Sequence, residues 1–233
     1  MINFCIIPAR SGSKNIKKKN VKLFNKKPLL YWSIKAARQS NCFDKIHVST
    51  DSLFIKNLAV KYGAEVPFLR KKKLSKDNSL MHDVVKYVMN VYKKKFNYCP
   101  DSVTILQPTS PLRDSKDIMK ALRLFYKDKS DSLVSVAEIS HYQHPNNLYR
   151  IRKNTLVPVS KKSILKNRQK VKLKLFSRNG ASIYITRVSK IKKYIVGGKI
   201  SAYIMPLLKS LDINNNDDFI LAELVQKKFK YNI

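Results

Sequence analysis

Short apolar runs alternate with amphipathic segments through the first 140 residues of the chain. Residues 4–7, 45–49 and 103–106 have the length and apolar content of buried strands. Further strands are expected at residues 65–68, 132–137, 182–186 and 202–205. Each run is bounded by polar residues, glycine or proline, which are typical of strand ends.

The segments between these runs predict helices, because apolar residues recur at intervals of three and four. Pro28 is placed to start the first helix, and Gly63 is placed to end the second. Asp217 and Asp218 suit the start of the last helix, since carboxylates favour the positive end of the helix dipole. Helices are expected at residues 28–39, 53–62, 80–95, 116–126 and 217–229.

This alternation predicts an α/β fold, a doubly wound and mostly parallel sheet with helices on both faces. In such folds ligands bind beyond the carboxyl ends of the strands. Polar clusters follow the expected strands at residues 10–14, 50–51 and 107–113. Their convergence predicts a binding site at this edge of the sheet.

The loop after the first strand has the composition of a phosphate site. Gly12 can expose backbone N–H groups there, and Arg10 and Lys14 can supply charge. The spacings GxxxxGK[ST] and GxGxxG are both absent from this loop, so neither a Walker-type NTPase nor a dinucleotide site is supported. The alternative is a surface turn that carries lysines because the whole chain is rich in them.

The rhythm of strands and helices breaks at residues 140–185. This segment is basic and has few long apolar runs, so we expect an excursion from a single domain of residues 1–233. Long excursions in compact domains often form lids or interfaces, and we favour a dimer-contact arm that also borders the site. A plain surface loop is the alternative.

Composition limits the classes of protein that need consideration. The chain has 233 residues, of which 44% are hydrophobic, which is ordinary for a globular protein. No run approaches the ~18 apolar residues of a membrane span, and the N-terminal pattern is not that of a secretion signal. The three cysteines and four histidines have no metal-ligand spacing. These features predict a cytoplasmic protein without a zinc site and without a membrane partner.

The formal net charge of +33 suggests nucleic-acid binding as an alternative function. However, the lysines are spread along the chain, for example at residues 71–73, 93–95 and 227–230. Asn and Ile are also abundant, as an A+T-rich coding sequence would produce. Because no nucleic-acid module accompanies the charge, we expect no specific nucleic-acid partner.

Eight sequence runs, in order along the chain, carry a resemblance to a known family. They are residues 6–14 (IIPARSGSK), 19–20 (KN), 27–29 (KPL), 49–51 (STD), 62–70 (YGAEVPFLR), 106–113 (LQPTSPLR), 179–181 (NGA) and 211–223 (LDINNNDDFILAE). With these runs the chain resembles the bacterial acylneuraminate cytidylyltransferases, the CMP-N-acetylneuraminic acid synthetase family, along nearly its whole length.

The resemblance implies a Rossmann-like nucleotidyltransferase fold and a reaction of CTP with a nine-carbon keto sugar acid. The products would be the CMP-sugar and pyrophosphate, with Mg²⁺ as cofactor and a homodimer, or a tetramer, as the assembly. The same reaction on legionaminic, pseudaminic or 3-deoxy-manno-octulosonic acid is an alternative. Such reactions depend on positioning and on cationic stabilisation of the phosphates.

The resemblance also assigns residues to the expected site. The cations expected to act in catalysis are Arg10, Lys14 and Lys19. The residues expected to bind nucleotide, besides Arg10, are Ser11, Gly12, Ser13, Asn20, Arg70, Ser79, Gln107 and Thr109, with Asp77 a weaker candidate. The residues expected to bind the sugar are Gln107, Arg168, Gln169, Asn179 and Tyr184.

The chain departs from the family pattern at the expected metal site. The family usually has Asp-Ile-Asp where this chain has Asp212-Ile213-Asn214. Asp212 and Asn214 are expected to hold Mg²⁺ on one side of an extended segment, although an amide brings no charge and should weaken binding. Lys26 and Lys17 stand where glycine and proline are common, which we expect to change loop shape only.

Overall fold

Strand β1 (Asn3–Pro8) is buried on both of its faces. The structure, a computed structural model, describes residues 1–13, 15–140, 143–159 and 174–231. In β1, Phe4 and Ile6 pack into one group of buried side chains, whereas Cys5 and Ile7 pack into another. Alternate residues of a strand point to opposite sides, so both faces of the sheet must be covered. This explains why the run is apolar without alternation.

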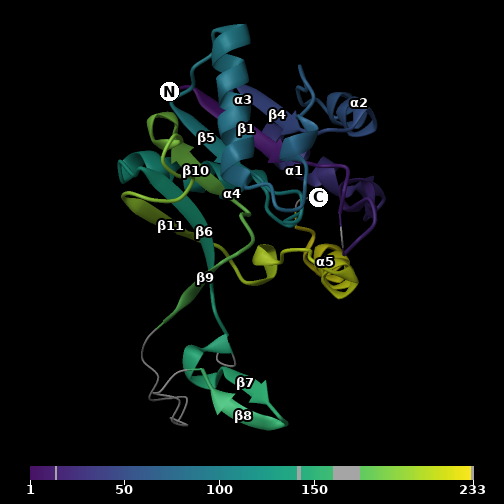
Figure 1. Cartoon of the computed structure of the whole chain (residues 1–233), viewed down its shortest axis with the longest axis vertical. Coiled ribbons are helices and arrows are strands. Elements are labelled where there is room, and N and C mark those ends of the chain that lie inside the picture. Colours follow the sequence, from purple (N-terminus) through teal and green to yellow (C-terminus); the bar gives the residue numbers. More distant parts are fainter. Residues whose placement is uncertain (14, 141–142, 160–173, 232–233) are drawn as a thin grey trace.

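The central sheet has seven strands within the described residues (Figure 1). Six of them follow across the sheet in the order β11 (Ile200–Ile204), β6 (Ser132–Glu138), β10 (Tyr184–Arg187), β5 (Ser102–Ile105), β1 and β4 (Lys45–Ser49). Strand β1 pairs in parallel with β4 and β5, and β11 pairs in parallel with β6. Strand β10 runs antiparallel between β5 and β6, and the seventh strand, β9 (Phe176–Arg178), runs antiparallel to β6. The mostly parallel α/β sheet confirms the expected fold class.

The two faces of the sheet are covered by α1 (Leu29–Ser40), α2 (Leu53–Lys61), α3 (Met81–Phe96) and α4 (Ser115–Lys127), each of which buries one apolar side. Helix α5 (Asn216–Phe229) packs instead on the start of α1 and on Phe24. Val85, Val88 and Tyr92 of α3 pack on the face that holds Phe4 and Ile6. Helices α1 and α4 pack together on the other face. Within the described residues, no helix is both long and apolar enough to cross a bilayer.

Short 3-10 turns connect several of these elements. They are η1 (Lys19–Val21), η2 (Lys72–Leu74), η4 (Pro145–Asn147), η6 (Val188–Lys190) and η7 (Leu208–Ser210).

The expected strand at residues 65–68 is wrong. The structure has only an isolated parallel bridge there, between His47 and Glu65. Pro67 lacks the N–H group that a longer ladder beside β4 would need. The Phe68 ring instead stacks on His47, with 5.0 Å between ring centroids.

A small hairpin joins the start of α1 to α5. It consists of β2 (Leu23–Phe24) and β3 (Lys27–Pro28), and its turn residues Asn25 and Lys26 have φ of 45° and 66°. The Asn25 N–H donates to a Glu223 carboxylate oxygen at 2.8 Å, which docks the turn on α5. Beneath it, the Phe24 and Phe219 rings meet edge to face at 5.5 Å.

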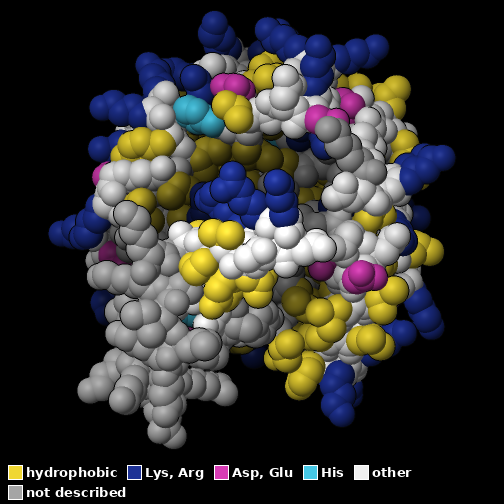
Figure 2. Space-filling view, turned by 60° about the horizontal axis from the view of Figure 1, so that its bottom comes forward, with side chains coloured by type: hydrophobic (Ala, Val, Ile, Leu, Met, Phe, Trp, Pro, Cys, Tyr) yellow, Lys and Arg dark blue, Asp and Glu magenta, His cyan; other side chains and the backbone are white. Residues whose placement is uncertain are grey.

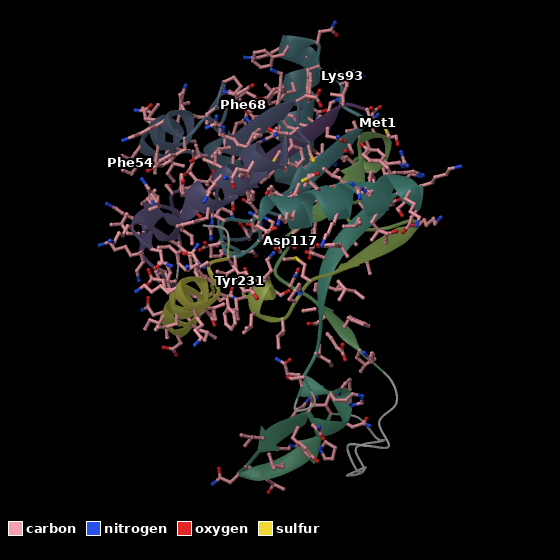
Figure 3. All side chains as sticks on the ribbon, turned by 180° about the vertical axis from the view of Figure 1, so that it is seen from behind. Met1, Phe54, Phe68, Lys93, Asp117 and Tyr231 are labelled. Carbon is pink, nitrogen blue, oxygen red and sulfur yellow. The ribbon has the colours of Figure 1, made fainter. Side chains whose placement is uncertain are left out.

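The excursion contains a second hairpin, formed by β7 (Tyr149–Arg152) and β8 (Thr155–Pro158). It projects from the sheet at the bottom of Figure 1, and every residue of both strands is exposed. Figure 3 shows its side chains standing apart from the rest of the described molecule. One face of the hairpin, which carries Ile151 opposite Leu156 and Tyr149 opposite Pro158, is entirely apolar.

Candidate functional site

The carboxyl ends of β1, β4 and β5 meet at one edge of the sheet, as parallel pairing requires. A cavity of about 290 Å³ opens at this edge. Most of the residues expected to bind nucleotide line it, and so does Lys19, one of the cations expected to act in catalysis. The expected nucleotide-binding residues that line it are Arg10, Gly12, Ser13, Asn20, Arg70, Ser79, Gln107 and Thr109.

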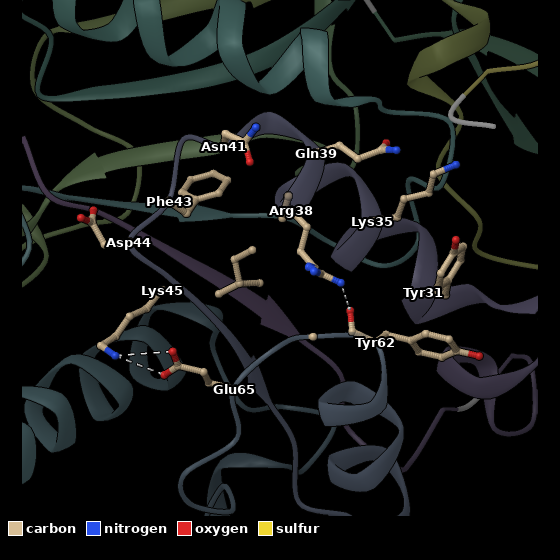
Figure 4. A pocket seen from close by; sticks show the side chains of 13 residues that line it. Tyr31, Lys35, Arg38, Gln39, Asn41, Phe43, Asp44, Lys45, Tyr62 and Glu65 are labelled. Carbon is tan, nitrogen blue, oxygen red and sulfur yellow. Dashed lines mark hydrogen bonds and ion pairs between the residues drawn. The ribbon is translucent and has the colours of Figure 1, made fainter.

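A larger cavity of about 580 Å³ lies between α1 and the amino end of β4 (Figure 4). Arg38 donates to the Tyr62 carbonyl at 3.3 Å within it, and Lys45 lies 3.4 Å from the Glu65 carboxylate. None of the expected site residues lines this cavity, and it faces the wrong end of the parallel strands for an α/β ligand site. We therefore place the functional site in the smaller cavity.

The loop after β1 is tied to the end of β4. The Ser11 backbone N–H and hydroxyl each donate to an Asp51 carboxylate oxygen at 2.8 Å. Ser11 thus anchors the loop and does not line the cavity with its neighbours. Lys14, also expected here, lies outside the described residues.

Gly12 leaves the loop backbone open. A Cβ placed on it would meet nothing within 4 Å in the described part of the chain, and its φ is not in the left-handed region. Neither a turn nor internal packing therefore demands glycine at this position. The open space suits the close approach of a ligand to the backbone, which was the reason for expecting Gly12 in the site.

Arg10 and Asn20 form the wall next to this loop. An Arg10 guanidinium nitrogen lies 2.5 Å from an Asp77 carboxylate oxygen and 3.4 Å from the Ser75 carbonyl. The Asn20 side-chain amide donates to the Arg10 carbonyl at 2.9 Å, which fixes the main chain where it enters the cavity. The ion pair with Arg10 brings Asp77, the weaker candidate, into the same site.

Lys19 reaches from η1 across to the C-terminal part of the chain. Its Nζ donates to the Ile213 carbonyl at 2.9 Å. Burial lowers the pKa of Lys19, the Asp212 and Asp218 carboxylates oppose this change, and the Arg10 charge adds to it. Because Lys19 also lines the cavity, its charge can act on an anion bound there.

Arg70 is nearly buried, and the end of β4 holds it in place. Its Nε donates to the Ser49 hydroxyl at 3.0 Å, and its Nη2 donates to the Ser49 carbonyl at 2.5 Å. Burial lowers the pKa of Arg70 to about 10, the Asp51 carboxylate raises it, and Arg10 lowers it. The group therefore remains a cation at neutral pH. Nearby, the Ser79 hydroxyl donates to the Lys73 carbonyl at 3.1 Å.

The segment after β5 joins the cavity to residues 181 and 213. The Gln107 N–H donates to the Ala181 carbonyl at 3.4 Å, and the Ile213 N–H donates to the Thr109 carbonyl at 2.8 Å. Three stretches that are far apart in sequence therefore meet at this loop.

Asp212 and Asn214 lie on the same side of their segment, as expected. The Asn214 amide donates to an Asp212 carboxylate oxygen at 3.2 Å. Burial raises the pKa of Asp212, although the Thr109 and Asn214 side chains and the Lys19 charge lower it. The carboxylate also packs on the Gly180 backbone, where a Cβ would come within 2.2 Å of its Cγ.

Lys209 holds the segment that leads to Asp212, and sequence reasoning did not identify it. Its Nζ lies 2.6 Å from Asp114 and 2.6 Å from Asp117, both at the start of α4. These carboxylates raise the pKa of Lys209 against the opposing effect of burial. A buried lysine in a lysine-rich chain has no sequence signal that separates it from the exposed ones.

The residues expected to bind the sugar are only partly brought to the cavity. The Asn179 amide points into the protein, where it accepts from the Ser135 hydroxyl at 2.6 Å and donates to the Ser210 hydroxyl at 3.0 Å. Tyr184 begins β10 and is half-buried, near Arg178 and Asp212. Arg168 and Gln169 lie outside the described residues.

Comparisons with known proteins show the family to which the chain belongs. A family profile described as cytidylyltransferase matches residues 4–205. N-acylneuraminate cytidylyltransferase of Escherichia coli is 34% identical over 234 residues, which cover 96% of this chain and 52% of that protein. Pseudaminic acid cytidylyltransferase of Campylobacter jejuni is 32% identical over 230 residues, which cover 97% of each chain. The chain thus spans about half of the first relative and nearly all of the second.

Similarity to solved structures supports the fold. CMP:2-keto-3-deoxy-manno-octonic acid synthetase, solved as a complex with CTP, matches with a TM-score of 0.74 at 15% identity. That match covers 98% of this chain and all of the other. The 4-diphosphocytidyl-2C-methyl-D-erythritol synthase of Anaerococcus prevotii matches with a TM-score of 0.63 at 11% identity, over 97% of this chain and 98% of that one. The profile match over most of the chain, together with the relatives above 30% identity, shows that this chain belongs to the cytidylyltransferase family.

Proposed function

We propose that the protein transfers CMP from CTP to a sialic-acid-like nine-carbon keto sugar acid, with release of pyrophosphate. The observation that carries this proposal is the cavity that brings Arg10, Lys19, Arg70 and Gln107 together at the carboxyl ends of the strands. Full-length relatives named for this class of reaction support it.

The cations of the cavity suit the charge that the reaction develops. The anomeric hydroxyl of the sugar would lose its proton to solvent, and its oxygen would bond to the α-phosphorus of CTP. The bond from that phosphorus to the α–β bridging oxygen would break, which releases pyrophosphate. Negative charge then grows on the departing pyrophosphate, where nearby cations lower the barrier most. Arg10 and Lys19 reach the cavity from the loop after β1, and the open backbone at Gly12 offers N–H donors beside them.

We also propose that Mg²⁺ binds beside Lys19. The donor set fits a weakly held Mg²⁺ ion, because Asp212 Oδ1 is buried without a hydrogen-bond partner among the described residues and Asn214 adjoins it. No cluster of three or more acidic, His or Cys side chains able to hold a metal exists in the described chain. Mg²⁺ needs few protein ligands, since it retains waters and binds phosphate oxygens, whose charge it neutralises.

The sugar class is proposed from relatives that differ in their named substrates. Besides the acylneuraminate and pseudaminate relatives, CMP-N,N'-diacetyllegionaminic acid synthase of Legionella pneumophila is 43% identical over 136 residues. All these sugars are acidic nine-carbon compounds, so a shared nucleotide site can serve each of them. We favour the acylneuraminate, with the other two and 3-deoxy-manno-octulosonate as alternatives.

We propose that a second copy of the chain covers the apolar face of the β7–β8 hairpin. A two-stranded hairpin without a covered face is marginal in water. Ile151 is 77% exposed and Leu156 is 62% exposed, whereas the opposite face carries Arg150, Arg152 and Thr155 besides Val157. A hairpin with one apolar face and one charged face is more typical of an interface between two copies than of a loop that is solvated on all sides.

The test of the proposed activity is pyrophosphate release from CTP and Mg²⁺ with a panel of sugars. The panel contains N-acetylneuraminate, legionaminate, pseudaminate and 3-deoxy-manno-octulosonate. We expect release with at least one nine-carbon sugar and much less with UTP. If circular dichroism shows that the protein is folded and no sugar leads to pyrophosphate release, the proposal is refuted.

A further inference from the structure

Arg113 is completely buried directly behind the candidate site. Transfer of a cation out of water is costly, so buried arginines are usually paired with carboxylates. The hydrogen bonds of Arg113 within the described chain go instead to neutral oxygens. Burial lowers the pKa of Arg113 to about 10, with Cys5, Asp117 and Asp114 opposing, so the group stays charged at neutral pH. Such an arrangement calls for a reason beyond packing.

The guanidinium group connects three separate segments. Its Nη1 donates to the Ser182 carbonyl at 2.6 Å and to the Gln107 carbonyl at 3.3 Å. Its Nη2 donates to the Ser33 hydroxyl of α1 at 2.7 Å, and that hydroxyl donates to the same Gln107 carbonyl at 3.2 Å. Only a planar fork with several donors can satisfy all these acceptors from one side chain.

These contacts immobilise the main chain of Gln107 and leave its side chain for a ligand. Its carbonyl accepts from Arg113, Ser33 and the Ser110 N–H, while its own N–H donates to Ala181. Within the described residues every hydrogen bond of Gln107 uses its main chain, and its side chain lines the cavity. Arg113 therefore supports the main chain from which that amide projects.

We infer that Arg113 is a positioning residue, which aligns the sugar with the α-phosphate by fixing Gln107 against the segment at residues 179–182. Because in-line attack is sensitive to small displacements, the effect falls on turnover and much less on CTP binding. The inference rests on the proposed function and adds to it a residue that touches neither substrate.

The experiment compares Arg113→Lys with Arg187→Lys as a matched control. Arg187 is a partly buried arginine whose Nε donates to the Ser130 carbonyl at 2.8 Å, so it too binds a main-chain oxygen. It ends β10, whereas Tyr184, which is near Asp212, begins that strand. The stoichiometry of CTP binding in calorimetry measures the active fraction of each protein. The value of kcat is then calculated per active site.

We expect Arg113→Lys to lower kcat by roughly tenfold to a hundredfold, as for a displacement of about 1 Å, with the Kd for CTP changed less than about threefold. Arg187→Lys should leave both quantities near the wild-type values. In a Gln107→Ala background, Arg113→Lys should reduce kcat no further, because the positioned group is already gone.

The outcomes separate the inference from the function on which it rests. Normal kcat in Arg113→Lys, or a loss that simply multiplies with that of Gln107→Ala, overturns the inference and leaves the proposed function intact. Absence of turnover in the wild-type protein overturns both. If Arg113→Lys does not fold, Ser33→Ala takes its place, since it removes one support of the same carbonyl and should lower kcat in the same selective way.

Discussion

Lys19 lies where the first loop meets the C-terminal segment, and its position gives the first prediction at the scale of residues. Lys19→Ala should reduce turnover by well over about tenfold with folding intact, because it removes charge that stabilises the departing pyrophosphate. Steady-state kcat and a thermal melt measure the two effects. Lys17→Ala is the control, because Lys17 lies two residues earlier and is exposed, so its loss should leave kcat unchanged. Near-normal turnover in Lys19→Ala would remove this residue from the site.

The pair of Asp212 and Asn214 gives a second prediction at this scale. Asn214→Asp adds a second carboxylate beside the first, at the position where the amide now lies 3.2 Å from it. We expect the Mg²⁺ concentration for half activity to fall, because charge raises the affinity for a hard cation. A Mg²⁺ titration of both proteins at saturating substrates checks this. An unchanged midpoint would mean that residue 214 does not contact the metal.

At the scale of elements, the β2–β3 hairpin carries a conformational cost. Lys26 has φ of 66° in its turn, in the left-handed region that favours glycine. Lys26→Gly should raise the free energy of unfolding by roughly 0.5–1 kcal/mol, which is the strain removed less the entropy that glycine loses. Urea unfolding measures the change. Lys27→Gly, one residue later in β3, should instead destabilise the protein, and stabilisation by both would rule out the conformational explanation.

The sequence was most informative where structure depends on local pattern. Strand β1 and helix α3 bury continuous or periodic apolar residues, so their positions were predicted within two residues. The expected strand at residues 65–68 failed because one proline outweighs a short apolar run. The cavity could be anticipated because parallel strands bring Arg10 and Gln107 to one edge.

Side-chain direction could not be predicted in the same way. Asn179 faces inward because partners from β6 and from residues 205–210 surround it, and these contacts depend on the tertiary fold. Ser11 was expected in the site by its motif, yet Asp51 takes both of its donors. The role of Arg113 likewise depends on segments far apart in the chain. Sequence pattern therefore located the site but not the connections that hold it.

At the scale of the whole molecule, the net charge of the chain and the β7–β8 hairpin have separate consequences. Lys and Arg total 48 against 15 Asp and Glu. Figure 2 shows Lys and Arg side chains around the outline of the visible face, with a further group in the hollow at its centre. This distribution matches a bias of composition better than a nucleic-acid footprint, which would gather cations on one face.

The β7–β8 hairpin gives a prediction for the oligomeric state of the protein. Ile151→Lys on the apolar face of the β7–β8 hairpin should shift the protein from dimer to monomer, because a charge cannot be buried there unpaired. Sedimentation equilibrium over a range of concentrations measures the shift. Thr155→Lys on the opposite face is the control and should leave the dimer intact. A monomeric wild-type protein would contradict the proposed pairing.

The place where the excursion joins the sheet has a further consequence. Glu138 pairs directly with Phe176 across β6 and β9, and the Ile139 N–H donates to the Leu175 carbonyl at 3.0 Å. The chain therefore leaves and re-enters the sheet at a single point. A segment inserted this way can change in length and sequence without disturbing the strands that carry the candidate site. Under the proposed function, changes in this segment would alter the assembly and the choice of sugar while the residues proposed to bind CTP stay as they are.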